Sequence, residues 1–221
     1  MNRIIACTLS LVTFFCMPAS AQKTVKITAL GGKSFCGFSL KSGFYNIGGT
    51  REYITREAVK GDNSGIPDVI QEIKNTLNFS VPIKVFIAAE EDNCFASIGE
   101  NGVRMIIADQ LFLNKVNKST GTQWAAISII AHEVGHHIAG FNRYTSQLKS
   151  ELDADYWSGY ILKKLGANQE AAVKCILYYG TDYDTSSHPN KRARAATIRQ
   201  GWNDAVKGSY DPSRCESCSD N

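Results

Sequence analysis

The sequence has no excess of charge of either sign. Its 24 Lys and Arg residues nearly balance its 21 Asp and Glu residues, so the formal net charge is +3 at pH 7. Proteins that bind nucleic acids or anionic membrane surfaces depend on strong positive fields. A balance this close to zero therefore predicts neither nucleic acid nor a membrane surface as a partner.

Long hydrophobic runs are missing after the first 21 residues. No later stretch of about 20 residues, the length that a membrane-spanning helix needs, is free of charge and histidine. At the start, Arg3 precedes an apolar run over residues 4–17, and small residues occupy 19–21. This pattern is typical of a secretory signal peptide, and the run is too short for a membrane anchor. We expect residues 1–21 to be removed, leaving a secreted or periplasmic protein of net charge +2 with no transmembrane segment.

Internal repeats, low-complexity tracts and linkers are also absent. Residues 22–205 are therefore expected to form one domain, which is long enough to bury its own core. A cysteine-containing tail, residues 206–221, follows this domain.

Cys215 and Cys218 form a Cys-x-x-Cys pair, which could be a redox pair or half of a zinc knuckle, but a second such pair and a thioredoxin-like setting are both lacking. Export favours disulfides, so this pair is expected to form one that holds the tail. Five cysteines remain after signal cleavage, so at least one of them is unpaired or joined to another molecule. Leaving out any one of the five and pairing the other four in three ways gives 15 possible sets of two disulfides. Cys36 could join a disulfide or place a thiolate on a metal. The cysteines that remain after signal cleavage are Cys36, Cys94, Cys175, Cys215 and Cys218.

Histidine is scarce, with four in the chain, yet three of them lie within residues 132–137. An apolar helix is predicted over residues 122–139, and Gly140 ends it. His132 and His136 are four residues apart, so both rings leave the same face of this helix. That spacing suits two nitrogen ligands of one Zn²⁺. Glu133 lies beside this face and suits a base that acts on water activated by the metal. The bland alternative is a chance HExxH string on a polar stripe, and His137 is not expected to be a ligand.

A catalytic zinc keeps a position for water and so needs a third protein ligand. A histidine six residues after His136 would be one solution, but Asn142 stands there. The other solution is a carboxylate from the next helix, predicted over residues 146–165. Glu151 and Asp155 share a face of that helix, so Glu151 can bind the metal while Asp155 accepts the outer N–H of a ligand histidine. Asp153 points away from this face and is expected to be a solvated charge.

The remaining pattern predicts an α+β fold. Alternating or apolar runs predict strands at 23–30, 83–88 and 103–108, and the Gly99–Gly102 run before the last of these is typical of a tight hairpin turn. Residues 31–50 are expected to be irregular or to form short strands. Further helices are predicted at 67–79, 169–179 and 189–205. We expect a small mixed sheet over the active-site helix, with an edge strand free to pair with an extended peptide, and a helical C-terminal half.

The run HEVGH followed by ELDAD resembles the gluzincin metallopeptidases, in particular the group of the CAAX prenyl proteases and the bacterial heat-shock membrane peptidases. The resemblance covers residues 83–205 and implies a zincin-like fold. Asn93-Cys94-Phe95-Ala96 resembles the segment before the edge strand in that group. His188-Pro189 with Arg194 resembles a further signature, which implies that His188 and Arg194 lie near the site and help to hold the substrate or the oxyanion. The alternatives are a helix-capping histidine and an ion-paired arginine.

Two departures limit what the resemblance implies. Family members often carry several membrane spans, so prenylated substrates and membrane quality control are not carried over to this chain. Cys94 stands where the family has alanine, which suggests a disulfide near the site.

These observations predict a secreted zinc-dependent endopeptidase with one Zn²⁺ per chain and a protein or peptide substrate. His132, His136 and Glu151 are the predicted ligands, and Glu133 is the predicted general base. Three alternatives remain at this point: a hydrolase acting on cell-wall amides, a periplasmic chaperone or scaffold that retains the fold, and a secreted binding domain with an incidental HExxH string.

Overall fold

The computed structural model describes residues 23–28, 37–39, 50–89, 91–99, 102–140 and 146–216. The predicted signal peptide, Cys36 and Cys218 lie outside these residues. The helices are α1 (Ile66–Leu77), α2 (Gln110–Thr120), α3 (Trp124–Ala139), α4 (Gln147–Lys164), α5 (Gln169–Tyr179), α6 (Lys191–Lys207) and the short 3-10 helix η4 (Pro212–Arg214). The strands are β1 (Lys23–Thr28), β2 (Gly37–Ser39), β3 (Thr50–Ala58), β4 (Lys84–Ala88), β5 (Asn93–Ile98) and β6 (Arg104–Asp109).

The strands form one mixed sheet in the order β1-β3-β4-β6-β5-β2. The predicted strands β4 and β6 do pair, but they run parallel. The reason is that the predicted hairpin turn joins β6 to β5, which the sequence analysis did not identify as a strand, and the β5–β6 pair is antiparallel. The remaining pairs in the sheet are also antiparallel.

The sequence analysis predicted an edge strand that is free to pair with an extended peptide, but the strand beside α3 is already paired within the chain. The outer edge of β5 is paired with β2 over residues 93–95. This pairing lies beside the helix that carries His132 and His136, because β5 packs on α3.

Two further elements, β3 and α2, were also missed by the sequence analysis. In β3 the inward-facing side chains include Thr55, which is polar, whereas Ile54 is exposed, so the usual alternation of apolar and polar residues is obscured. Helix α2 begins where the carboxylate of Asp109 accepts hydrogen bonds from the backbone N–H groups of Leu111 and Phe112. Asp109 is also the last residue of β6, so one side chain ends a strand and caps a helix.

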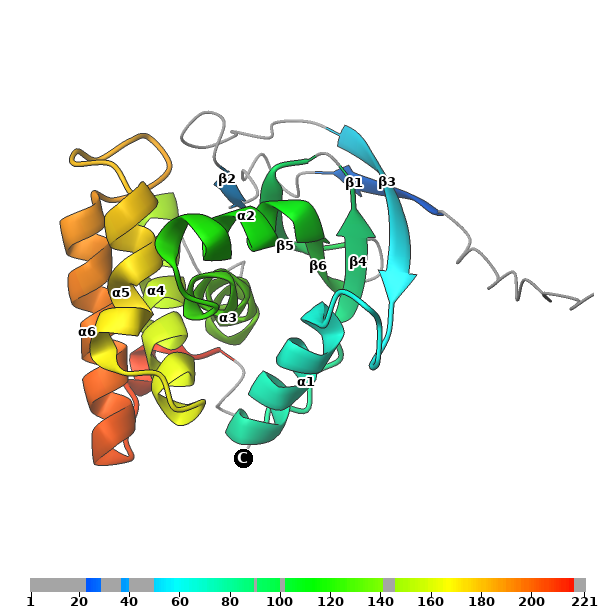
Figure 1. The fold of residues 1–221 in the computed structure, drawn as a ribbon. Helices are drawn as coiled ribbons and strands as arrows, with labels where there is room; N and C mark the ends of the chain where they lie inside the picture. The colour runs from blue at the N-terminus through cyan, green and yellow to red at the C-terminus, as the bar shows by residue number, and fades with distance from the viewer. Residues whose placement is uncertain are drawn as a thin grey trace, which may run out of the picture.

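Helix α3 lies in the centre of the molecule, between the sheet on one side and α4 to α6 on the other (Figure 1). Every residue from Ser128 to Ala139 is buried. Its apolar side chains join a core cluster with residues of α1, α2, α4 and the helix-facing side of the sheet. A helix buried all round cannot shift without disturbing two layers, so this position fixes the orientation of its histidines.

Helices α4 and α6 pack at unusually short range. A Cβ atom added at Gly159 of α4 would lie 1.9 Å from the carbonyl oxygen of Ile198, and one added at Gly201 of α6 would lie 1.9 Å from that of Tyr156. Only glycine fits at these two positions. The close approach brings the beginning of α6, including Arg194, against the face of α4 that carries Asp155.

The segment after α6 returns to α4 and to the end of α3. Trp157 donates a hydrogen bond from Nε1 to the carbonyl oxygen of Arg214 at 2.7 Å, and the backbone N–H of Glu216 donates to Ile138. Arg214 and Lys149 form ion pairs with Asp153, which is almost fully buried. The prediction that Asp153 is a solvated charge is therefore wrong, because this returning segment covers it.

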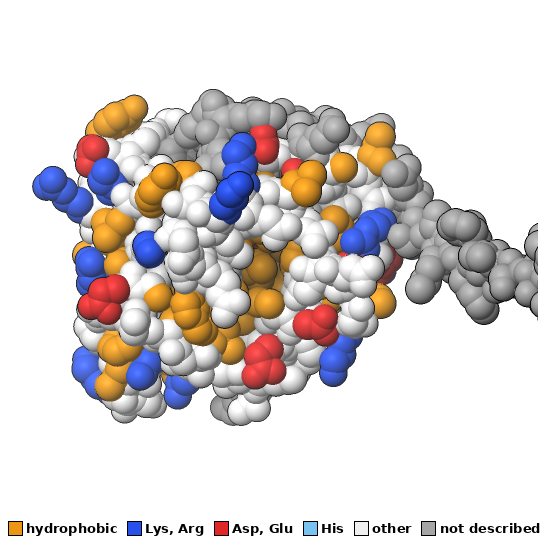
Figure 2. Space-filling model, viewed as in Figure 1, with side chains coloured by type: hydrophobic (Ala, Val, Ile, Leu, Met, Phe, Trp, Pro, Cys, Tyr) orange, Lys and Arg blue, Asp and Glu red, His pale blue; other side chains and the backbone are white. Residues whose placement is uncertain are grey.

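The surface shows no large area of one charge. On the face drawn in Figure 2, basic and acidic side chains are interspersed with apolar ones, and no histidine is visible. All four histidines are buried. Within the described residues, none of the helices combines the length and apolar character that crossing a bilayer demands.

Candidate metal centre

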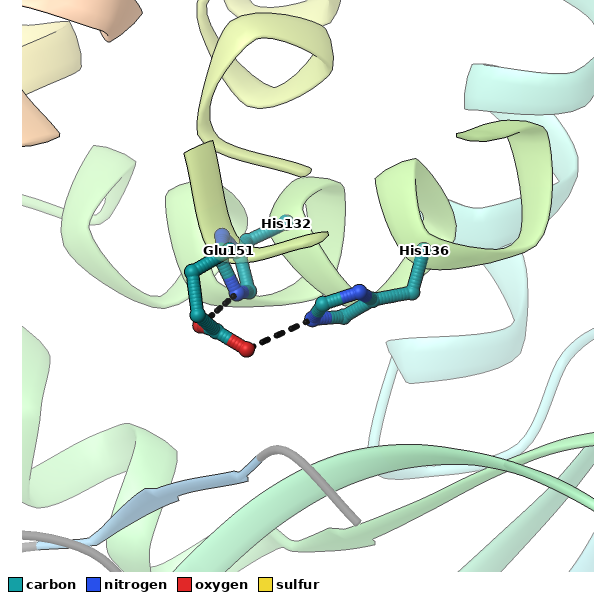
Figure 3. Close-up of side chains that lie close together, drawn as sticks. All are labelled: His132, His136 and Glu151. Atoms are coloured by element: carbon teal, nitrogen blue, oxygen red, sulfur yellow. Dashed lines mark ion pairs between the residues drawn. The ribbon is translucent and has the colours of Figure 1, made fainter. Parts of the chain in front are cut away.

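Three buried ligand atoms from α3 and α4 point toward one another (Figure 3). The Nε2 atom of His132 lies 3.4 Å from Oε2 of Glu151, and the Nε2 atom of His136 lies 3.6 Å from Oε1 of the same carboxylate. The three ligand atoms all lie within 4.8 Å of one another. The predicted ligand set is therefore brought together by the fold, as a group that could hold a metal ion.

The distances suit a small tetrahedral ion. Ligand bonds of about 2.0–2.1 Å at tetrahedral angles separate neighbouring ligand atoms by about 3.3 Å. The two distances from Glu151 to the histidine nitrogens are close to this value. In addition, Oε1 of Glu151 and Oε1 of Glu133 are buried without a hydrogen-bond partner. Buried polar groups are seldom left in this state, and a cation between them would satisfy them.

Contact between the two helix backbones sets the position of Glu151 relative to the histidines. A Cβ atom added at Gly135, between the two ligand histidines in sequence, would lie 2.7 Å from the carbonyl oxygen of Ala154. A larger residue at Gly135 would push α3 and α4 apart. The glycine within the HEVGH string is thus needed for the three side chains to meet.

The outer nitrogen of each ligand histidine also has a neighbour. Nδ1 of His132 lies 2.9 Å from Oδ1 of Asp155, as predicted for a carboxylate that fixes the tautomer. Nδ1 of His136 lies 3.4 Å from the hydroxyl oxygen of Ser150, a contact that the sequence analysis did not anticipate. The two imidazoles are therefore held unequally, one by a carboxylate and the other by a hydroxyl group.

Arg194 supports the carboxylate behind His132. Its Nε and Nη2 atoms donate to the two oxygens of Asp155 at 2.7 and 2.9 Å, and the arginine is almost completely buried. Nη2 also lies 3.9 Å from Glu151. The prediction placed Arg194 near the site, and the structure puts it behind the ligands, where it positions Asp155.

Burial and the neighbouring charges shift the pKa values of the side chains in this cluster. Burial lowers the pKa of His132, but the charge and hydrogen bonding of Asp155 outweigh it and raise that pKa to about 10. Burial lowers the pKa of His136 to about 3. Burial alone would raise the pKa of Glu151, but the surrounding histidines, His188 first, hold it well below its usual range. Before any metal binds, a protonated His132 thus lies beside the ionised carboxylates of Glu151 and Asp155.

Glu133 lies beside the ligands and contacts the sheet. Its Oε2 atom accepts a hydrogen bond of 2.8 Å from the backbone N–H of Ala96 in β5. Burial raises the pKa of Glu133 to about 8, although the charge of His132 opposes this. A carboxylate with a pKa near neutrality can both take and return a proton, which is what a general acid–base group requires.

His188 also reaches the cluster. Its Nε2 atom lies 3.2 Å from Oε2 of Glu151, and its Nδ1 atom lies 2.9 Å from the hydroxyl of Ser187. Its backbone N–H donates to the side-chain oxygen of Thr185 at 2.9 Å. The loop before α6 thus folds on itself and presents a third imidazole to the carboxylate of Glu151, beside those of His132 and His136. Nothing in the sequence pattern pointed to Thr185 or Ser187, because their roles depend on the shape of this loop.

Two other predictions concern residues close to the cluster. His137 is buried, and its Nε2 atom lies 3.0 Å from the carbonyl oxygen of Met105 in β6, so it joins the helix to the sheet rather than to the metal site. Cys94 is a buried free thiol, as is Cys175, so the suggestion of a disulfide near the site is wrong. Cys94 is fully buried in the core cluster that includes residues of α3. Cys215 does take part in a disulfide, and its predicted partner Cys218 lies outside the described residues.

Compared with protein-family models, with curated proteins and with solved structures, the chain matches none of them. The functional argument therefore depends on the residues of the site itself.

Proposed function

We propose that this protein is a zinc-dependent endopeptidase of the gluzincin type, in which His132, His136 and Glu151 hold one Zn²⁺ and Glu133 is the general base. The observation that carries the proposal is the convergence of two imidazole nitrogens and one carboxylate, all buried and mutually within 4.8 Å, beside a second carboxylate, that of Glu133. A purely structural zinc site would supply four protein ligands instead of three.

The donor set favours zinc over harder cations. Two neutral imidazoles and one carboxylate are typical of catalytic zinc, whereas calcium and magnesium take oxygen ligands. When bound, zinc would polarise a carbonyl group and lower the pKa of water at the site. The protein contributes the fixed positions of the ligands, because α3 is buried on all sides and Asp155 holds the ring of His132.

Glu133 is suited to move the proton. Its carboxylate is anchored on one oxygen by Ala96, and the other oxygen, Oε1, has no hydrogen-bond partner and is available to accept a proton from water. It would then deliver that proton to the leaving amine when the peptide bond breaks. His188, whose Nε2 atom lies 3.2 Å from Oε2 of Glu151, is proposed to help to hold the substrate, as the resemblance to the gluzincins implies.

A polypeptide is the proposed substrate because a sheet strand runs beside the base. Strand β5 supplies the backbone contact to Glu133, and an extended peptide can add to the edge of such a strand through main-chain hydrogen bonds. The resemblance of HEVGH and ELDAD to gluzincins supports the same substrate class. The proposed place of action is outside the cytoplasm, as the signal-peptide pattern of residues 1–21 indicates.

Replacing Glu133 with glutamine tests this proposal. Glu133→Gln keeps the shape and the Ala96 contact but cannot take a proton, so zinc content should stay near one per chain while peptide cleavage falls about 10²–10⁴-fold. Cleavage would be measured on casein and on a peptide library, with chelator and zinc re-addition as controls. Equal cleavage by Glu133→Gln and the wild type would exclude the mechanism. Turnover of cell-wall fragments without turnover of peptides would assign a different amide as the substrate.

A further inference from the structure

The outer edge of β5 carries the contact that anchors the general base. Ala96 lies opposite Ile106 of β6, yet its N–H group donates to Glu133. In an antiparallel pair, N–H groups alternate between the partner strand and the opposite edge. The N–H of Ala96 therefore points away from β6, and by the same alternation so does that of Cys94. The carboxylate of Glu133 thus lies at the edge of β5 on which a peptide would pair.

The chain's own strand β2 occupies the adjoining part of this edge. Gly37, Phe38 and Ser39 pair antiparallel with Phe95, Cys94 and Asn93, in that order. Within the described residues, this pairing reaches Phe95, the neighbour of Ala96. Figure 1 shows β2 at the end of the sheet that lies toward the helical half of the molecule, whereas β1 forms the other end.

We propose that β2 is an internal competitor for this edge, which an extended substrate must displace before it can lie along β5 next to Glu133. This inference rests on the proposed peptidase function and adds a form of regulation to it. The register also predicts the orientation of a bound substrate. Like β2, the substrate would run antiparallel to β5, and a segment longer than β2 in the same register would extend past Ala96.

The length of β2 suits displacement. Within the described residues it pairs at three positions, whereas strands usually extend over five or six residues, so this part of β2 forms few main-chain hydrogen bonds. A substrate that pairs over more residues can replace those bonds and add new ones. The apparent affinity for such a substrate is reduced by the fraction of molecules in which the edge is open. Removing the competitor should therefore lower KM and leave kcat unchanged.

Proline substitutions in β2 test this expectation with a matched control. Because Phe38 lies opposite Cys94, its N–H points toward β5, whereas that of Ser39 points away. Phe38→Pro removes a donor facing β5, and Ser39→Pro keeps it, since proline is tolerated where the N–H faces away from the sheet. If β2 covers the edge nine-tenths of the time, Phe38→Pro should lower KM about tenfold at constant kcat and zinc content. Ser39→Pro should match the wild type.

A disulfide that holds β2 on the edge of β5 tests the reverse case, in which a substrate cannot displace β2. Residues that lie opposite each other in an antiparallel pair have Cα atoms about 4.5–5.5 Å apart, within the range that a disulfide spans. Phe38→Cys should therefore bond to the free thiol of Cys94 when treated with oxidised glutathione. The bonded protein should lose peptide cleavage and keep its zinc, while Phe38→Cys/Cys94→Ala should stay active under the same treatment.

The outcomes separate this inference from the proposed function. If the wild type cleaves peptides but Phe38→Pro has the same KM, or the cross-linked protein cleaves as fast as the wild type, β2 is not a competitor and the peptidase proposal stands. Failure of Phe38→Cys to bond with Cys94 would also overturn the inference, whatever the activity. If no variant and no wild-type protein cleaves peptides with zinc bound, the peptidase proposal fails and the competitor role fails with it.

Discussion

Replacing Asp155 with asparagine should weaken both the fold and the metal site. Asp155 accepts two hydrogen bonds from Arg194, whose side chain is buried, with 3% of the residue exposed. In Asp155→Asn the guanidinium group stays buried but loses this carboxylate, and the carboxylate of Glu151 lies farther away, at 3.9 Å. Breaking a buried ion pair from one side costs about 3–5 kcal/mol. For a domain of this size, that corresponds to a fall in Tm of about 6–20 °C for the metal-free protein.

The same substitution removes the group that orients His132. Loss of such an outer partner typically lowers metal affinity about 10–100-fold. The two effects can be separated with the double variant Asp155→Asn/Arg194→Met, in which no buried cation is left unpaired. We expect this variant to recover much of the lost stability while its zinc affinity stays low, because the carboxylate behind His132 is still missing.

Urea unfolding of the metal-free proteins would measure stability, and competition with a chromogenic chelator would measure zinc affinity. Asp153→Asn is the matched control, since Asp153 is also buried on α4, but its partners Arg214 and Lys149 are partly exposed and can turn to water. It should leave zinc affinity unchanged. Zinc affinity of Asp155→Asn within twofold of wild type, or a double variant no more stable than Asp155→Asn, would refute this reasoning.

Four further predictions follow from the structure. Because His132 has a pKa of about 10 without metal, it is protonated at pH 7, and zinc should displace about one proton, visible as buffer-dependent heats in calorimetry; no buffer dependence would contradict this. A pKa raised by folding stabilises the protein below the unfolded value of about 6.5, so the metal-free protein should lose stability as the pH rises from there to about 10, measured by thermal melts. Gly159→Ala should destabilise by about 1–3 kcal/mol in urea unfolding because the carbonyl of Ile198 blocks the new methyl group, whereas the same change in an open helix would stabilise. Ser150→Ala should weaken zinc binding less than Asp155→Asn does, since the hydroxyl lies 3.4 Å from His136.

Local patterns were enough to predict the central part of the site. The spacing of His132 and His136 and the apolar run around them predicted α3, and the carboxylates of the next helix predicted Glu151. The structure confirms that these three residues meet. Such predictions succeed because helical periodicity fixes which side chains share a face, whatever the rest of the chain does.

Contacts between distant segments could not be predicted in this way. The bond from Ala96 to Glu133 depends on β5, whose residues show no clear alternation because both faces of the strand are buried. The exposure of Asp153 was misjudged because Arg214 arrives from 61 residues away. Likewise, the pairing of β2 with β5 depends on three residues in a stretch without periodicity.

The ion pair between Asp153 and Arg214 has a consequence for when the surroundings of α4 are completed during translation. The ribosome completes α4 at Lys164 and must add 50 more residues before Arg214 exists. At about 5–20 residues per second, this takes about 3–10 s. During that interval the buried carboxylate of Asp153 lacks Arg214, and α4, which supplies Glu151, lacks the segment that covers it. The candidate metal site is therefore expected to be completed late in biosynthesis, and the proposed peptidase activity would begin only after translation of the described fold.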